Sequence, residues 1–170
     1  MKIKFLVALL VLVNTVSFAQ WKPVGDKLKT PWAETINPEN VLPEYPRPIM
    51  ERKDWQNLNG LWEYAILSKG QAEPASFDGK ILVPFAVESS LSGVQKRVGK
   101  DNELWYKRTF NIPSNWKNKN ILLHFGAVDW KAEVYLNDIK IGTHTGGFTP
   151  FSFDITPFLT SGTQKLVVRV

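Results

Sequence analysis

From Asn59 to the end of the chain, apolar and polar residues alternate in short segments that polar turns separate. This period of two is typical of β-strands with one buried face, and no stretch of ten or more residues repeats with the helical period. In 131–136 every even-numbered residue is apolar, and Asn137-Asp138 then supplies a tight turn. The pattern disfavours parallel βαβ folds, including nucleotide-binding ones. The predicted strands are 61–67, 81–84, 104–112, 120–125, 132–136, 139–141, 151–155 and 165–170.

Eight short strands with polar turns predict an all-β fold, a β-sandwich and most simply a jelly roll. The chain has 170 residues, of which 44% are hydrophobic, and this is enough for one core. A (β/α)₈ barrel takes about 250 residues, so no enzyme built on that fold fits within this length. There is no cysteine for a disulfide or thiolate metal site, and two histidines leave little room for an imidazole cluster. We expect no cofactor and no metal.

Residues 1–19 predict a secretory signal peptide. Two lysines precede an unbroken apolar run at 5–13, and Ser17-Phe18-Ala19 places small residues at the −3 and −1 positions of a cleavage site. A membrane anchor needs roughly 17 to 25 apolar residues, whereas Asn14 interrupts this run after nine. We therefore expect an exported chain, periplasmic or extracellular, with no membrane contact after cleavage.

The net charge of +5 does not indicate a nucleic-acid partner. Two of the lysines lie in the predicted leader, and the Lys and Arg residues of 95–108 and 115–131 alternate with apolar and acidic residues. Binding to a phosphate backbone requires a clustered basic face. We expect no nucleic acid among the partners.

Residues 20–50 predict a Pro-rich extended arm ahead of a β-sandwich domain over 51–170. Six of the eleven prolines fall in this arm, and proline both removes a hydrogen-bond donor and fixes φ. A flexible leader is the alternative. Against it, the arm carries apolar side chains that a solvated linker does not need, which favours an arm lying along the surface of the body. These residues are Trp21, Trp32, Val41, Leu42, Tyr45, Ile49 and Met50.

No catalytic arrangement stands out. The sixteen carboxylates show no telling spacing, and the chain has no Gly-x-Ser-x-Gly elbow, Walker loop or His-Glu-x-x-His motif. Asn102-Glu103 matches the Asn-Glu dipeptide of many retaining glycosidases, but its place at the entry to a sandwich strand favours a structural role. His124 falls within an apolar strand and is predicted to be a half-buried histidine with satisfied hydrogen bonds. We expect no catalysis by this chain alone.

The seven tryptophans invite a carbohydrate interpretation, because flat indoles stack on pyranose rings. Most are better explained as core or interface, among them Trp55, Trp62 and Trp105. Trp130 follows Asp129 in a loop between two strands and is the better surface candidate.

The segment Gly142-Thr-His-Thr-Gly-Gly-Phe-Thr-Pro150 is predicted to be a constrained loop. Gly146 and Gly147 allow backbone geometries that other residues resist, and His144 and Phe148 flank them. This loop could approach a sugar or a neighbouring domain, or it could only turn the chain between sandwich edges.

Six blocks, in order, resemble the N-terminal sugar-binding domain of glycoside hydrolase family 2, the β-galactosidase, β-glucuronidase and β-mannosidase family. The resemblance runs from about Tyr45 to Val170. The arm from Trp32 to Pro48 also resembles the leader of exported β-galactosidase-like members. The blocks are Arg47-Pro48 with 54–62, 83–84 through 88–93, 104–110, 125–130, 134–137, and 144–148 with 153–156.

The resemblance implies a galactose-binding-domain-like jelly roll, followed in the family by an immunoglobulin-like domain and a (β/α)₈ barrel. The barrel holds two glutamates, acid/base and nucleophile, about 5–5.5 Å apart as retention requires. Both would lie beyond Val170, so no catalytic residue is transferred. Relatives contact sugar hydroxyls from the loop that here carries Asp101-Asn102. A second, acidic contact of some relatives falls here on Thr145-Gly-Gly147, which departs from a galactose-type contact.

The sequence therefore predicts the non-catalytic head of a retaining exo-β-glycosidase, with β-linked glycans and the missing domains of the same polypeptide as partners. The apolar segment 166–170, with no turn or polar cap after it, also favours a chain cut from something longer. The substrate-binding candidates are Asp101, Asn102, Trp130 and His144. The alternatives are a free-standing, lectin-like carbohydrate-binding module and a purely structural β-sandwich.

Overall fold

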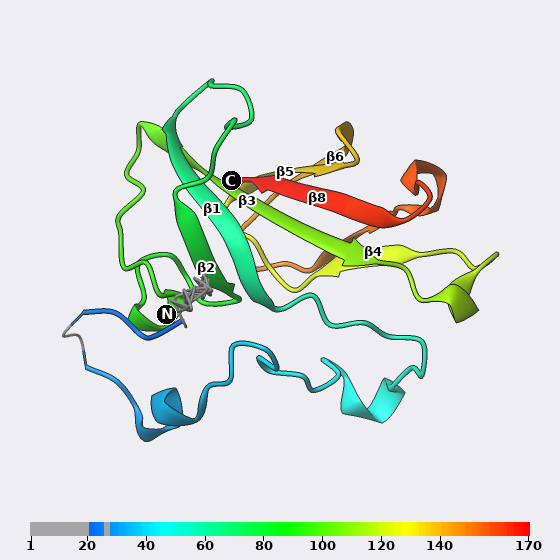
Figure 1. The fold of residues 1–170 in the computed structure, drawn as a ribbon, viewed down its shortest axis with the longest axis horizontal. Coiled ribbons are helices and arrows are strands. Elements are labelled where there is room, and N and C mark those ends of the chain that lie inside the picture. Colours follow the sequence, from blue (N-terminus) through cyan, green and yellow to red (C-terminus); the bar gives the residue numbers. More distant parts are fainter. Residues whose placement is uncertain (1–20, 26–27) are drawn as a thin grey trace, which may run out of the picture.

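The computed structural model describes residues 21–25 and 28–170 and arranges them as a β-sandwich with an arm beneath it (Figure 1). All eight predicted strands are present. Five short 3-10 helices lie between them: η1 (Pro31–Thr35), η2 (Pro48–Met50), η3 (Ser90–Ser92), η4 (Ser114–Trp116) and η5 (Thr156–Phe158). The strands are β1 (Gly60–Ser68), β2 (Gly79–Val83), β3 (Asn102–Asn111), β4 (Leu122–Phe125), β5 (Lys131–Leu136), β6 (Ile139–Thr145), β7 (Phe151–Asp154) and β8 (Thr163–Arg169).

The strands form two antiparallel sheets of unequal width. The larger sheet has the order β2-β1-β3-β8-β5-β6, and β4 pairs only with β7 in the smaller one. Strands in a sheet are about 4.8 Å apart, so six strands span about 24 Å and two span about 5 Å. The small sheet therefore covers only part of the inner face of the large one.

Strand β6 corrects the prediction of a loop over 142–150. It continues past Ile141 to Thr145, because its pairing with β5 resumes after a register shift between Val134 and Tyr135. The irregular segment is thus confined to 146–150.

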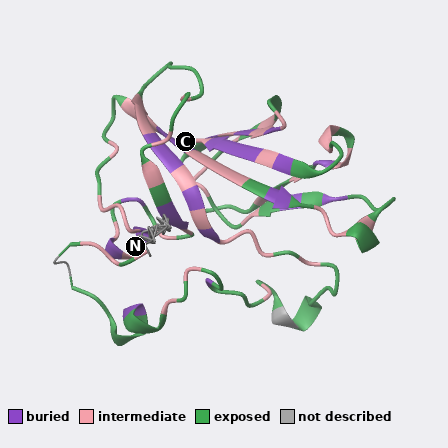
Figure 2. Cartoon of the chain, in the orientation of Figure 1, coloured by how far each residue is buried: buried purple, intermediate pink, exposed green. Residues whose placement is uncertain are grey.

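The core lies on the inner face of the large sheet, where the period-two pattern places alternate residues (Figure 2). Leu136 and Leu166 are fully buried there, and Trp62 is 6% exposed. A second, smaller cluster of Ala65, Trp105 and Val167 lies on the outer face. Of the three tryptophans predicted as core or interface, Trp62 and Trp105 are buried on opposite faces of the sheet, and Trp55 is half-buried.

The arm contacts the body at several points. The Val24 N–H donates to the Ser90 carbonyl at 3.1 Å, and the Asn57 amide donates to the carbonyls of Val41 and Leu42. Val41 is 3% exposed. Proline has no N–H, so the prolines reduce the number of hydrogen-bond donors in the arm. The Asn57 side chain of the body supplies the donors to Val41 and Leu42.

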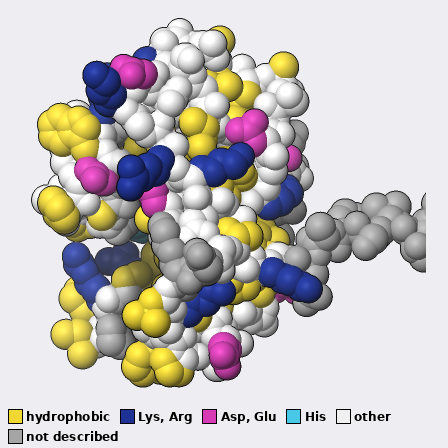
Figure 3. All heavy atoms as spheres, turned by 90° about the vertical axis from the view of Figure 1, so that its left-hand side faces the viewer, with side chains coloured by type: hydrophobic (Ala, Val, Ile, Leu, Met, Phe, Trp, Pro, Cys, Tyr) yellow, Lys and Arg dark blue, Asp and Glu magenta, His cyan; other side chains and the backbone are white. Residues whose placement is uncertain are grey.

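The predicted signal peptide, residues 1–19, lies outside the described residues and stays a prediction, as does the boundary of the arm at 50. Within 21–25 and 28–170, no helix is long and apolar enough to cross a membrane. On the face in Figure 3, the described Lys and Arg side chains are interspersed with acidic and apolar groups.

Candidate functional site

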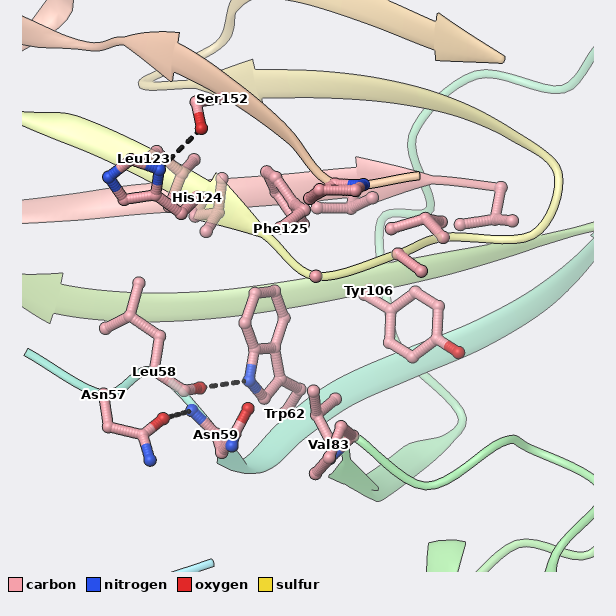
Figure 4. Close-up of a pocket in the computed structure, with 18 of the residues that line it drawn as sticks. Asn57, Leu58, Asn59, Trp62, Val83, Tyr106, Leu123, His124, Phe125 and Ser152 are labelled. Atoms are coloured by element: carbon pink, nitrogen blue, oxygen red, sulfur yellow. Dashed lines mark hydrogen bonds between the residues drawn. The ribbon is translucent and has the colours of Figure 1, made fainter. Parts of the chain in front are cut away.

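An open groove of about 1640 Å³ runs between the inner face of the large sheet, the small sheet and the arm (Figure 4). Trp62 and Tyr106 project from the large sheet, and His124 and Phe125 lie on the opposite wall. The groove exists because two strands cover six only in part. Its walls combine aromatic rings with a few polar groups, as ligand sites do.

Three segments distant in sequence meet at one end of the groove, which we call the edge end: Asn102, Asp129, Trp130 and Val170. Ser68 pairs with Asn102, and Leu104 exchanges two backbone hydrogen bonds of 2.9 Å with Val170. β5 begins beside the end of β8, since Glu133 pairs with Arg169. The sheet register thus brings the start of β3, the end of β8 and the start of β5 to the same edge.

Asn102 and Asp101 differ in their placement at this edge. Asn102 lines the groove, and its side-chain N–H donates to the Val98 carbonyl at 2.7 Å. Asp101 is exposed, does not line the groove, and its carbonyl accepts from the Lys69 N–H. Of the two candidates, only Asn102 can present polar atoms to the groove.

Trp130 is 63% exposed and lines the groove, in agreement with its prediction as a surface residue. Its carbonyl accepts a 2.8 Å hydrogen bond from the Gly146 N–H. A Cβ on Gly147 would lie 2.6 Å from Oδ1 of Asp129, so only glycine lets the two loops approach so closely. The glycine pair therefore holds the Trp130 loop in place.

His144 is in β6 rather than in a loop, which corrects the prediction. It lies opposite Ala132, and its ring stacks on Phe151 with centroids 4.1 Å apart. Its Nε2 is hydrogen-bonded to the Thr149 hydroxyl at 3.2 Å. His144 is not among the residues that line the groove. The structure thus gives it a packing role between the sheets.

His124 is exposed, so the prediction of a half-buried histidine was wrong, although its hydrogen bonding is as expected. Nδ1 lies 2.5 Å from the Ser152 hydroxyl, and the ring stacks against Trp55 at 6.1 Å. Partial desolvation, with Arg52 and Arg47 nearby, lowers the pKa of His124.

Glu103 and Glu133 share Arg169 on the outer face of the sheet. The guanidinium donates to both Glu103 oxygens, at 2.7 and 2.9 Å, and to Glu133 at 3.2 Å. The hydrogen bonds from Arg169 hold the pKa of Glu103 below 4.5, and a bond from Lys140 does the same for Glu133. A general acid needs a raised pKa, so neither carboxyl suits that role, in line with the structural interpretation of Asn102-Glu103.

This ion pair makes stability depend on pH. Because the pKa of Glu103 is lower in the folded chain, its stabilising contribution is present above pH 4.5 and is lost as the pH falls through the folded value. We expect Glu103→Gln to lower the free energy of unfolding by about 1 kcal/mol at pH 7, and the difference from wild type to vanish in acid. Urea unfolding between pH 3 and 7 measures it, with the exposed Glu39→Gln as control. A difference that stayed constant down to pH 3 would contradict this account.

Within the described residues, no group of three or more His, Asp or Glu side chains could hold a metal ion. No sequence pattern predicted the other end of the groove, where Trp55 stacks with His124. The contact between Trp55 and His124 depends on the path of the chain before β1, which no local pattern predicts.

Eight strands in two antiparallel sheets have the architecture of a jelly-roll domain. Residues 94–170 match the family described as glycosyl hydrolases family 2, sugar binding domain. Residues 94–170 therefore belong to the sugar-binding domain of this family.

Similar proteins are much longer than this chain. The β-galactosidase of Thermoanaerobacter pseudethanolicus is 38% identical over 66 residues, which are 39% of this chain and 9% of that protein. The β-glucuronidase of Canis lupus familiaris is 31% identical over 140 residues, covering 69% of this chain and 20% of that protein. The solved β-glucuronidase of Faecalibacterium prausnitzii superposes with a TM-score of 0.57 at 30% identity, over 74% of this chain and 22% of that one. The chain spans 7% to 22% of the first curated relatives it matches.

Proposed function

We propose that this chain is the non-catalytic head of a retaining exo-β-glycosidase that hydrolyses β-linked glycans. Its partners in this proposal are an immunoglobulin-like domain and a (β/α)₈ barrel of the same polypeptide. Support comes from the family and from relatives named β-galactosidase and β-glucuronidase, of which this chain covers 7% to 22%. In this proposal the two catalytic glutamates belong to the barrel.

The observation that carries the proposal is that Asn102 and Trp130 both line the groove at the edge end, at the starts of two strands that flank β8. An amide offers both a donor and an acceptor for sugar hydroxyls, and an exposed indole offers an apolar face to a pyranose ring. Both line the groove and are fixed from behind, Asn102 by Val98 and Trp130 through Gly146. A rim of this kind can complete a sugar pocket whose other wall is a neighbouring domain.

The chain's own carboxylates fit a binding role better than a catalytic one. Glu103 and Glu133 are among the residues that line the groove, but hydrogen bonds from Arg169 hold both of them. The domain therefore supplies contacts and shape, and we expect the 170-residue chain to release no nitrophenol from 4-nitrophenyl β-glucuronide or β-galactoside. Turnover by the purified chain would overturn this placement of the catalytic groups.

The edge end is tested in the polypeptide encoded by the complete reading frame. Asn102→Ala is expected to lower kcat/KM roughly 10- to 100-fold, about 1.4 to 2.8 kcal/mol of transition-state stabilisation. Asn115→Ala, exposed in η4, is the matched control and should have no effect. Equal kcat/KM values for the two variants, with unchanged melting temperatures, would exclude a sugar contact by Asn102.

The same reading frame separates the proposal from its rival. Codons that continue into a barrel with two glutamates support the glycosidase head. A stop codon after Val170, together with glycan binding that Trp130→Ala abolishes, would instead indicate a free-standing carbohydrate-binding module.

A further inference from the structure

The groove has a second end, formed where the arm crosses the small sheet, which we call the arm end: Tyr45, Arg47, Arg52, Trp55 and His124. All five line the groove. β1 separates the two ends, because its first residues follow the arm and its last residue pairs with Asn102. Eight steps along a strand correspond to about 26 Å. A single monosaccharide is therefore too short to contact both ends of the groove.

Aromatic rings form one side of the arm end. Tyr45 meets Trp55 edge to face with centroids 4.8 Å apart, and Trp55 in turn stacks with His124 at 6.1 Å. The His124 ring is held by its 2.5 Å hydrogen bond to Ser152. These contacts fix the rings of Tyr45 and Trp55 against β4. The aromatic surface is therefore formed before any ligand binds.

Cationic groups form the other side. Arg47 and Arg52 are exposed, and among the described residues no carboxylate forms an ion pair with either. Their charges act on His124, whose pKa they help to lower.

Two carboxylates also line this region, and they do not cancel the arginines. Asp54 is engaged by Lys119 and accepts a 3.2 Å hydrogen bond from the Trp116 indole. Glu44 is exposed. Apart from the Asp54–Lys119 pair, this region of the groove therefore has two guanidinium groups, from Arg47 and Arg52, and one carboxylate, from Glu44.

We propose that the arm end binds an acidic glycan, with Arg47 and Arg52 holding a uronic-acid carboxylate while the ring lies against Trp55 and Tyr45. Guanidinium groups bind carboxylates through two parallel hydrogen bonds, and a pyranose adds apolar contact with an indole. The charge of the site favours a uronic acid over a neutral sugar, and its aromatic surface favours a sugar over a simple anion. The proposal does not depend on the edge end or on a catalytic barrel.

The test is calorimetric titration of the 170-residue chain with three probes of similar length. A hyaluronan hexasaccharide carries β-linked glucuronate, chitohexaose is a neutral β-linked glycan, and hexaglutamate is an anion without sugar rings. We expect the hyaluronan fragment to bind at least tenfold more tightly than either of the others, with affinity falling as salt rises.

Variants assign the binding to the arm end. Arg47→Gln with Arg52→Gln should weaken hyaluronan binding at least tenfold, while Lys22→Gln with Lys100→Gln, which removes equal charge from exposed residues outside the groove lining, should not. Trp55→Ala should weaken hyaluronan binding without affecting hexaglutamate, and melting curves establish that each variant is folded. Equal binding of hexaglutamate, equal binding of chitohexaose, equal loss in the lysine variant, or no binding at millimolar hyaluronan would each overturn the proposal.

Discussion

Replacing Gln164 by leucine is expected to lower the free energy of unfolding by about 2–4 kcal/mol, although the side chains are similar in size. Gln164 is 1% exposed, and its amide is fully used. The oxygen accepts from the Asn137 side chain at 2.8 Å and the Thr160 N–H at 3.0 Å. The nitrogen donates to the carbonyls of Thr160 and Gly162 at 2.8 and 2.7 Å.

The loss is large because four hydrogen bonds of one buried amide disappear together, although Asn137 is half-buried and Thr160 and Gly162 are exposed. Asn137 also donates to the Phe158 carbonyl at 2.9 Å and accepts from the Lys165 N–H at 2.9 Å. The network thus fastens the β5–β6 turn to the segment between β7 and β8. Leucine fills the space but makes none of these four hydrogen bonds, and it leaves the half-buried Asn137 amide without one of its partners.

Urea unfolding of the purified chain measures the effect. Gln71→Leu, at an exposed position, is the control and should stay within about 0.5 kcal/mol of wild type. Combined with Asn137→Ala, the loss from Gln164→Leu should be smaller than in the wild-type background, because the two residues share a bond. A loss no greater than that of the control would show that the network does not carry stability.

The strands could be predicted from sequence because their alternation directly reflects burial. In β5 the apolar residues Ala132, Val134 and Leu136 all face the core and are fully buried. The same rule could not separate Trp62 from Trp105, since both lie in largely apolar strands. Only the sheet shows that Trp62 belongs to the inner cluster and Trp105 to the outer one.

The edge end was predictable in its residues but not in its geometry. Asn102 and Trp130 were each identifiable from sequence, but their shared edge follows from the strand order β1-β3-β8-β5, which no local pattern encodes. His144 was misplaced because Gly142 was interpreted as the start of a loop, whereas the register shift in β5 lets β6 continue through it. The arm end had no sequence signal, because Trp55 and His124 meet only through tertiary packing.

Gly142, which was predicted to begin a constrained loop, is required for packing between the sheets. In most strands, exchanging glycine for alanine stabilises by about 0.5–1 kcal/mol, because glycine loses more backbone freedom on folding. Gly142 lies under the ring of Phe153 from β7, and a Cβ there would lie 2.7 Å from Cζ and closer still to Cε1. We therefore expect Gly142→Ala to reverse the usual sign and destabilise the chain by about 1–3 kcal/mol.

Two comparisons isolate the cause. Gly126→Ala is the matched control, since a Cβ at Gly126 meets no atom within 4 Å, and it should be neutral or slightly stabilising. In a Phe153→Ala background the ring is absent, so Gly142→Ala should be neutral or should stabilise the chain by up to about 1 kcal/mol. An equal loss in both backgrounds would place the strain in the backbone of β6 rather than between the two sheets. The cycle thus measures the energetic coupling between Gly142 of the large sheet and Phe153 of the small sheet, and so the contribution of this contact to the packing of the two sheets.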